Sequence, residues 1–374
     1  MRGRYTIPYR QDMQLLRTTL SKTFAVLTTV LAIALPFLLS SNVRLPLNFP
    51  SAEWLTAINF ALIAVIGAAA FNLLLGYAHQ ISVAHAAFLM LGTTASAVFG
   101  TLWGWPFFVV LLVSGLLGAI VGIIVGLPAL RLRGLYLLIA TLGVHFIALF
   151  AYQSFTTSFF GFDAITFQPP SLTSWIDWLR FFGSGGRGGF VISGDFRWYW
   201  VLLPISAGSV LFMSNIVRTR EGRALMAVRD HDVSAALIGI NVTRSKLLVF
   251  AVSSAFVAMS GALGSYFIGA RSGESFPFEV VLNYSIMAIV GGFTTMQGAV
   301  LGAFFFYLTP VLLKWAFVQM PGLRSIGFLR TYAEQTNLAL FGILVIVILV
   351  VRPSGLTGMW QSTKNYFAQW PYSS

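Results

Sequence analysis

Long apolar runs set the limits on what this chain can fold into. Of its 374 residues, 57% are hydrophobic and only 9% are charged. Runs of roughly 20 apolar residues are long enough to cross a bilayer as helices. We expect an all-α polytopic membrane protein with about ten transmembrane helices, because lipid satisfies no backbone polar groups. The predicted spans are 23–40, 56–75, 85–100, 106–127, 134–152, 198–217, 247–269, 279–291, 299–317 and 337–351.

Two of these runs are short. The run 279–291 is too short to cross alone, which indicates a broken helix, and 85–100 is also short. The first run follows a basic arm and has no clear A-x-A cleavage site, so we expect it to be a retained span.

The distribution of charge predicts the orientation of the chain. With a cytoplasmic N-terminus and ten alternating spans, the inside segments hold 15 of the 23 Lys and Arg residues. Lys and Arg accumulate in cytoplasmic loops, so both termini are expected in the cytoplasm, and the net charge of +12 needs no nucleic-acid partner. The expected segments are a basic arm (1–22), five spans (23–152), a periplasmic loop (153–197), a sixth span (198–217), a charged cytoplasmic loop (218–246), four spans (247–351) and a cytoplasmic tail (352–374).

The predicted spans lack the groups that ion-coupled carriers use. No Asp or Glu lies deep within a span, and Lys and Arg are absent from the span centres. A proton-driven carrier usually keeps an ionisable group at depth, although sodium can be held by carbonyl and hydroxyl oxygens. An ion-coupled secondary transporter is therefore the alternative class. The chain has no Gly-Lys pair, so its GSGGRGG stretch does not match a phosphate-binding loop.

Polar residues interrupt the apolar sequence once in each half of the chain. One interruption reads GYAHQISVAH at 76–85, and the other reads GGFTTMQG at 291–298. Paired breaks indicate a mid-membrane binding site and a possible inverted repeat, whereas two cytoplasmic turns would give the same pattern. The candidate residues of a substrate path are Asn72, Gln80, Ser82, His85, Thr141, His145, Asn283 and Gln297.

His145 lies in the middle of a predicted span. A hydrogen-bonded neutral histidine of the core and a residue lining a transport path both fit this position. A metal ligand is the weakest interpretation, because no second ligand lies at useful spacing.

Glycines recur every three or four residues within 106–127. Gly115, Gly118, Gly122 and Gly126 share one helical face. Such a face predicts close packing against a neighbouring helix.

The charged loop contains a short apolar run between charged flanks. We expect helices at about 221–229 and 233–238, with Asp232 as the N-cap of the second and Gly239 at its left-handed C′ position. An apolar helix that projects into the cytoplasm indicates docking into a groove on a partner. An amphipathic segment on the bilayer surface is the alternative.

Four stretches of the chain, in the same order, resemble the permease subunits of ABC importers for branched-chain and other hydrophobic amino acids, the LivM type. They are NLLLGYAHQISVAHAAFLMLG, LRLRGLYLLIATLGV, the charged loop with the helix after it, and RPSGLTG. Together they cover about residues 72–360.

The resemblance implies a division of labour between chains. Such a permease works with a second permease subunit, as a homodimer or heterodimer, with two ATP-binding subunits that hold ATP and Mg, and with a periplasmic solute-binding protein. This chain would be a transport subunit of the bacterial inner membrane, with no enzymatic activity, cofactor or metal of its own. Its charged loop would couple ATP hydrolysis to transport, through the candidate residues Glu221, Arg223, Arg229, Asp230, Asp232, Ala235, Ala236 and Gly239.

The resemblance also implies a class of substrate. Branched-chain or hydrophobic amino acids are expected, while sister permeases carry urea, short amides or aromatic acids. Two departures leave the choice open. Ala84 stands where the family usually has glycine, and TTSFFGFDAITF replaces a Thr-Gly-Gly-x-x-Gly segment near the outer side.

Overall fold

The protein divides into two units, Met1–Leu55 and Thr56–Ser374. A computed structural model describes residues 30–37, 39, 51–80, 82–129, 132, 134–161, 164–167, 171–172, 190–191, 194–293, 295–319, 333–351 and 355–359. In the first unit, residues 30–37 are helical. The basic arm, most of the tail and part of the first predicted span lie outside the described residues, so the count of about ten spans and the side of the termini stay predictions.

Seven helices among the described residues are long and apolar enough to cross a membrane. They are α3 (Ser51–Asn72) continued by the π-helical η1 (Leu73–Tyr77), α4 (His85–Ala95) continued by the π-helical η2 (Ser96–Leu102), α5 (Phe107–Ala129), α6 (Leu135–Phe160), α7 (Asp195–Arg218), α10 (Val242–Ile268) and α12 (Met296–Gln319).

Two further apolar helices are shorter, α11 (Glu279–Gly291) and α15 (Ala333–Val351). With 13 residues, α11 rises about 20 Å, whereas the hydrocarbon core of a bilayer is about 30 Å thick. The prediction that 279–291 does not cross alone is confirmed.

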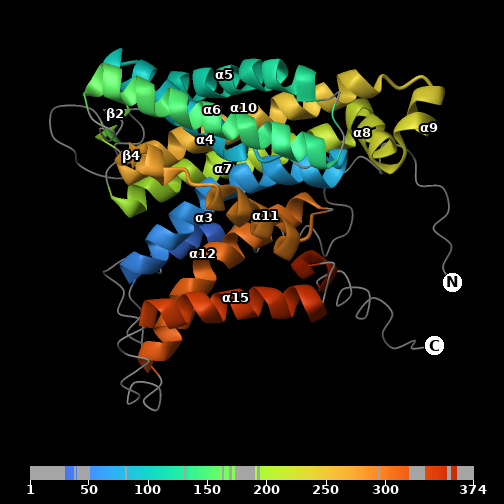
Figure 1. Cartoon of the computed structure of the whole chain (residues 1–374). Coiled ribbons are helices and arrows are strands. Elements are labelled where there is room, and N and C mark those ends of the chain that lie inside the picture. Colours follow the sequence, from blue (N-terminus) through green and yellow to red (C-terminus); the bar gives the residue numbers. More distant parts are fainter. Residues whose placement is uncertain are drawn as a thin grey trace, which may run out of the picture. The chain divides into compact units, whose positions relative to one another are not determined.

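The helices of the unit Thr56–Ser374 form two packed groups on either side of α3. α10 packs against α4 and α5, whereas α12 packs against α11 and α15 (Figure 1). α3 contacts both groups. The Ser260 hydroxyl of α10 donates to the Ile63 carbonyl at 2.9 Å, and Phe60 stacks on Tyr307 of α12 with ring centroids 5.8 Å apart.

The glycine face of α5 packs against α10. A Cβ atom added at Gly118 would lie 2.6 Å from the Ser254 carbonyl oxygen, and one added at Gly122 would lie 2.7 Å from the Ser254 side chain. Only glycine fits at such a distance. The predicted close packing on this face is confirmed.

The segment 153–197 begins as helix rather than as loop. α6 continues to Phe160 and ends at Gly161, which has φ +71°. The predicted span ended at residue 152, where Gln, Ser and Thr residues begin to interrupt the apolar run. Phe155 and Phe159, four residues apart, keep the helical spacing and pack with ring centroids 4.7 Å apart, so the helix continues.

Two short strand pairs follow α6, so the described chain is not wholly helical. β1 (Ala164–Thr166) pairs antiparallel with β4 (Ala270–Ser272), directly after α10. β2 (Ser171–Leu172) pairs antiparallel with β3 (Phe190–Val191). The first pair ties the segment after α6 to the end of α10, although the two stretches are far apart in sequence.

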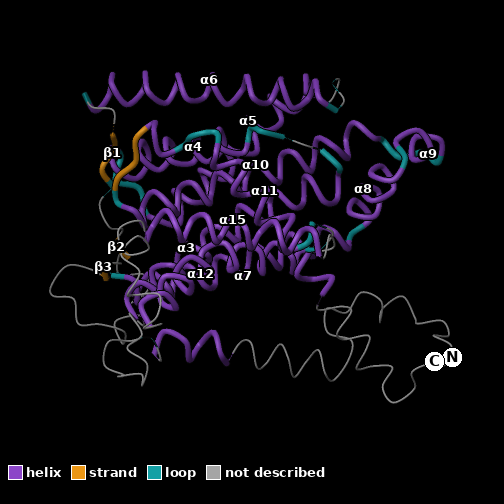
Figure 2. Tube along the Cα trace, turned by 60° about the horizontal axis from the view of Figure 1, so that its bottom comes forward, coloured by secondary structure: helices purple, strands orange, loops and turns teal. Residues whose placement is uncertain are grey.

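The charged loop forms two helices, α8 (Arg220–Asp230) and α9 (Asp232–Leu237). Figure 2 shows them at one end of the helices, with β1 at the opposite end. We call these the loop end and the strand end. Gly239 has φ +86°, as predicted for the C′ position. The prediction of Asp232 as N-cap is wrong: His231 holds that position.

The Asp232 carboxylate has a different partner. It accepts a hydrogen bond from Lys246 Nζ at 2.6 Å, which joins α9 to the first turns of α10. An ammonium group at this distance competes with a backbone N–H for the carboxylate, and this explains why the local capping signal failed.

Candidate functional site

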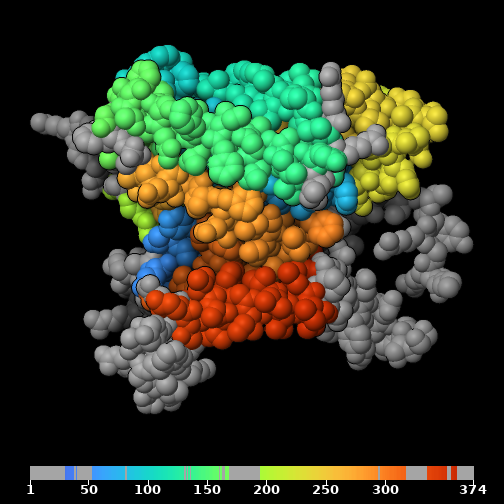
Figure 3. Space-filling model, viewed as in Figure 1, coloured from blue at the N-terminus to red at the C-terminus, as the bar shows by residue number. Residues whose placement is uncertain are grey.

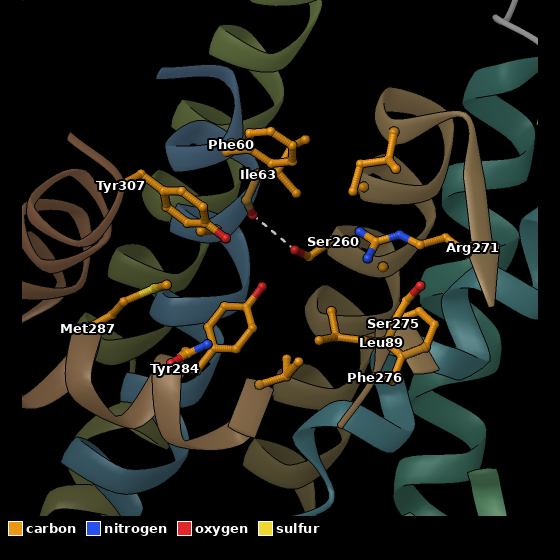
Figure 4. A pocket seen from close by; sticks show the side chains of 16 residues that line it. Phe60, Ile63, Leu89, Ser260, Arg271, Ser275, Phe276, Tyr284, Met287 and Tyr307 are labelled. Atoms are coloured by element: carbon orange, nitrogen blue, oxygen red, sulfur yellow. Dashed lines mark hydrogen bonds between the residues drawn. The ribbon is translucent and has the colours of Figure 1, made fainter. Parts of the chain in front are cut away.

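A cavity of about 210 Å³ lies where α3, α4, α10, α11 and α12 meet near the strand end (Figure 4). Drug-sized ligands usually occupy roughly 300–1,000 Å³, so the cavity suits a smaller solute. Its walls are mostly apolar or aromatic. The polar side chains that line it are Ser260, Arg271, Ser275, Asn283, Tyr284 and Tyr307.

Arg271 is held at the rim of the cavity by its backbone. It is the middle residue of β4 and pairs with Ile165 of β1, which is fully buried. The Tyr152 hydroxyl of α6 donates to the Arg271 carbonyl oxygen at 3.2 Å. Two elements distant in sequence therefore fix the position from which the Arg271 side chain enters the cavity.

The Arg271 guanidinium points across the cavity towards Tyr307 and Tyr284 (Figure 4). Its Cζ atom lies 5.3 Å from the centroid of the Phe276 ring. Its Nε atom is buried and has no hydrogen-bond partner. Burial lowers the pKa of the Arg271 guanidinium, but arginine stays charged in proteins.

Tyr284 forms the wall opposite Arg271, with His85 behind it. A Cβ atom at Gly67 would lie 2.6 Å from Tyr284 Cε1, so the glycine makes room for the ring. The His85 ring centroid is 4.4 Å from that of Tyr284 and 5.3 Å from that of Phe71. His85 thus supports the wall of the cavity without lining it.

Asn283 is the one predicted path residue that lines the cavity. Gln297 is exposed at the start of α12. His145 is buried in α6, and its Nδ1 atom has no hydrogen-bond partner. Within the described ranges, no cluster of His, Asp and Glu side chains is placed to hold a metal ion.

Sequence reasoning missed Arg271, which it counted as an ordinary outside charge. A signal existed. Arg271 follows the long apolar helix α10 almost directly, in a segment that the charge count predicts to lie on the side with fewer basic residues.

The two polar interruptions lie side by side at the loop end. Asn72 Nδ2 donates to the Thr295 carbonyl at 2.7 Å, and a Cβ atom at Gly76 would lie 2.9 Å from the Phe293 carbonyl carbon. Arg229 Nη1 of α8 donates to the Gly76 carbonyl oxygen at 2.8 Å. This placement beside the charged loop favours two turns over two mid-membrane breaks.

Three further path candidates lie in or against the same turn. Gln80 and Ser82 are buried, and the Ser82 hydroxyl accepts a hydrogen bond from the Ala84 N–H at 3.3 Å. The Thr141 hydroxyl accepts from the Val83 N–H at 3.0 Å, which ties the turn to α6. These contacts hold the turn together and do not reach the cavity.

α9 and Ile238, the residue directly after it, carry exposed apolar side chains. Val233, Leu237 and Ile238 are 70%, 82% and 74% exposed, whereas Ala235 is buried against the rest of the protein. Ala236 and Gly239 are also exposed. Figure 3 shows the loop helices, in yellow, protruding at the surface. Exposing large apolar side chains to water is unfavourable, and contiguous exposed apolar surface often marks an interaction site. The exposed side of α9 is therefore suited to contact with a partner.

The charged residues of the loop are arranged around α8. Glu221 is exposed, and Arg223 Nη1 donates to the Arg218 carbonyl at 3.0 Å. Arg229 also contacts the Asp230 carboxylate at 3.4 Å. Arg229 therefore joins the loop surface to the turn that contains Gly76.

Seven of the described helices are long and apolar enough to cross a membrane, and four of them (α3, α4, α10 and α12) meet with α11 at a small cavity, as fits a multi-pass membrane permease. The family model described as "Branched-chain amino acid transport system / permease component" matches residues 54–349, and the chain belongs to this family.

Curated relatives agree with this assignment. The chain is 25% identical over 351 residues to the "High-affinity branched-chain amino acid transport system permease protein LivM" of Escherichia coli K12, covering 91% of this chain and 76% of the relative. It is 25% identical over 247 residues, 66% of either chain, to a "Probable branched-chain amino acid transport permease protein LivM" of Methanocaldococcus jannaschii. A shorter match, 35% identical over 109 residues, is to the E. coli K12 "Xylose transport system permease protein XylH" and covers 28% of this chain and 27% of that one.

Proposed function

We propose that this chain is the permease subunit of an ABC importer and forms the translocation path for a branched-chain or hydrophobic amino acid. The observation that carries the proposal is the exposed apolar surface of α9, formed by Val233, Leu237 and Ile238 at the loop end. Family membership and the names of the LivM relatives support the substrate class.

The energy source is a partner chain rather than an ion gradient. Among the described residues, the acids of the long apolar helices lie at helix ends, such as Glu53 in α3 and Asp195 in α7. A carrier that binds protons at depth needs an acid or its equivalent there. ATP and Mg are held by two ATP-binding subunits, and this chain has no cofactor of its own.

Docking at α9 can reach the membrane helices by two routes. The ion pair between Asp232 and Lys246 joins α9 to α10. The hydrogen bond from Arg229 to the Gly76 carbonyl joins α8 to the turn after α3. Because Asn72 also contacts Thr295, a movement of the loop acts on both turns together.

The loop end faces the cytoplasm and the strand end faces the periplasm in this proposal. A periplasmic binding protein delivers the solute at the strand end, close to the cavity. A second permease subunit, identical or different, completes the path. Outward-facing apolar side chains such as Leu112 of α5 and Phe150 of α6, 70% and 73% exposed, contact lipid or that subunit.

Reconstitution tests the proposal. The chain is purified with its two ATP-binding subunits and its sister permease, inserted into liposomes and supplied with the loaded binding protein. L-leucine should then accumulate only when ATP is present. Accumulation without the ATP-binding subunits, or accumulation that an uncoupler abolishes at constant ATP, would show an ion-coupled carrier instead.

A further inference from the structure

We propose that Arg271 binds the carboxylate of the transported solute, so that the cavity is a transit site for small solutes with a carboxylate next to an apolar body. This inference rests on the proposed function and narrows its substrate class. It places a specificity-determining residue in the permease itself.

The first support is the charge balance around Arg271. Its Nε atom is buried without a hydrogen-bond partner, and no described carboxylate forms an ion pair with it. Arg271 as a whole is half-buried, and a charge that is withdrawn from water is costly unless it is paired. The Phe276 ring at 5.3 Å offsets part of this cost by a cation–π contact. An incoming carboxylate would supply the missing hydrogen bonds, because its two oxygens match the guanidinium fork.

The second support is the room made for the guanidinium. A Cβ atom at Gly264 of α10 would lie 3.0 Å from Arg271 Nη2. Ser260 and Gly261, one turn earlier on the same helix, also line the cavity and are small. With its backbone held by Ile165 and Tyr152, Arg271 needs little reordering when a ligand binds.

The third support is the chemistry of the other walls. Ile63, Leu89, Ile268 and Met287 offer an apolar surface for an aliphatic side chain. No acid is among the described residues that line the cavity, so an ammonium group would meet amide and hydroxyl oxygens, such as those of Asn283 and Ser275. A neutral solute such as urea or an amide would leave the Arg271 charge uncompensated.

Direct binding to the assembled transporter tests the inference. The complex in lipid nanodiscs, without binding protein or ATP, is heated in the presence of L-leucine, 4-methylpentanoate or L-leucinamide. L-leucine and 4-methylpentanoate, which carry the carboxylate, should raise the unfolding midpoint, and L-leucinamide should not. Arg271→Gln should weaken the apparent affinity for L-leucine by about tenfold or more, and Arg271→Lys should restore part of it.

Lys314→Gln is the matched control, because Lys314 is an exposed basic residue of α12 that does not line the cavity. It should bind L-leucine as the unchanged protein does. The inference is overturned if Arg271→Gln binds L-leucine as tightly as the unchanged protein, if L-leucinamide binds equally well, or if no probe shifts the unchanged complex. If the unchanged complex binds L-leucine but shows no ATP-driven uptake, that result counts against the proposed function instead.

Discussion

The two ends of the molecule differ, in opposite senses, from the usual rule that charges are exposed and apolar side chains are buried. At the strand end, the cation Arg271 enters a cavity with a buried Nε atom and no hydrogen-bond partner for it. At the loop end, Leu237 and Ile238 stand in solvent, 82% and 74% exposed, while the Asp232 carboxylate beside them is paired with Lys246. Each end therefore has side chains that lack a suitable partner. Arg271 at the strand end lacks an anion, and the apolar side chains at the loop end lack an apolar protein surface to pack against.

α10 connects the two ends. It begins after α9, where Asn241 caps it by accepting a hydrogen bond from the Arg244 N–H at 3.0 Å, and it ends next to β4 and Arg271. If the ends have separate tasks, changes at one end should leave the other task intact. The following variants test this comparison, ordered by their expected effect on transport.

Ala236→Asp should have the largest effect. Ala236 is exposed among the apolar side chains of α9, and a carboxylate there would be buried without a partner when the ATP-binding subunit docks. ATP-driven uptake of L-leucine should fall more than tenfold, while the yield of folded protein stays the same.

Thr243→Asp is the control for this variant. Thr243 is exposed in the first turn of α10, where an acid is favourable to the helix dipole. Its uptake should match that of the unchanged complex. Normal coupling in the Ala236→Asp complex would show that α9 is not the docking surface.

Gly118→Val should disrupt the contact between α5 and α10. The added side chain would press on the Ser254 backbone, which already lies 2.6 Å from the position of a Cβ atom. Overpacking of this kind costs about 1–3 kcal/mol. Thermal unfolding of the complex should occur at a lower temperature, and uptake should fall with the loss of folded protein. Gly143→Val in α6, where a Cβ atom meets nothing within 4 Å, should change the unfolding temperature less; the reverse order would contradict the packing assigned to α5.

Arg229→Met should reduce coupling without abolishing it. The variant removes the guanidinium and its hydrogen bond to the Gly76 carbonyl but keeps an unbranched side chain that reaches about as far as Nε. A single hydrogen bond to a charged group that is partly exposed is worth roughly 1 kcal/mol, so uptake per ATP hydrolysed should fall several-fold. An unchanged ratio of uptake to hydrolysis would remove this route from the account.

His145→Ala should have the smallest effect on transport. His145 is buried in α6 and does not line the cavity. Its loss should lower the unfolding midpoint and the protein yield, whereas the KM for L-leucine should stay the same. A changed KM with normal yield would place His145 on the transport path.

The sequence predicts well those features that depend on local spacing. The glycines at 118 and 122 repeat at helical intervals, and the structure places them against α10. The two loop helices and the left-handed Gly239 follow from the same kind of signal.

The cavity could not be predicted in this way. It depends on the pairing of Ile165 with Arg271 and on the contact of Tyr152 with the Arg271 carbonyl, both between residues more than 100 positions apart in the chain. Asn283 alone among the predicted path residues lines it, because polarity in a span does not reveal which side chains converge. The N-cap assigned to Asp232 failed for a similar reason, since its partner Lys246 lies in the next helix.

The most direct test compares Arg271→Gln with Ala236→Asp in the same reconstituted complex, measuring L-leucine binding without ATP and L-leucine uptake with ATP. We expect Arg271→Gln to weaken binding, whereas Ala236→Asp should bind L-leucine normally and fail in uptake. If Arg271→Gln binds normally, or if Ala236→Asp loses binding together with uptake, the division of tasks between the two ends is contradicted.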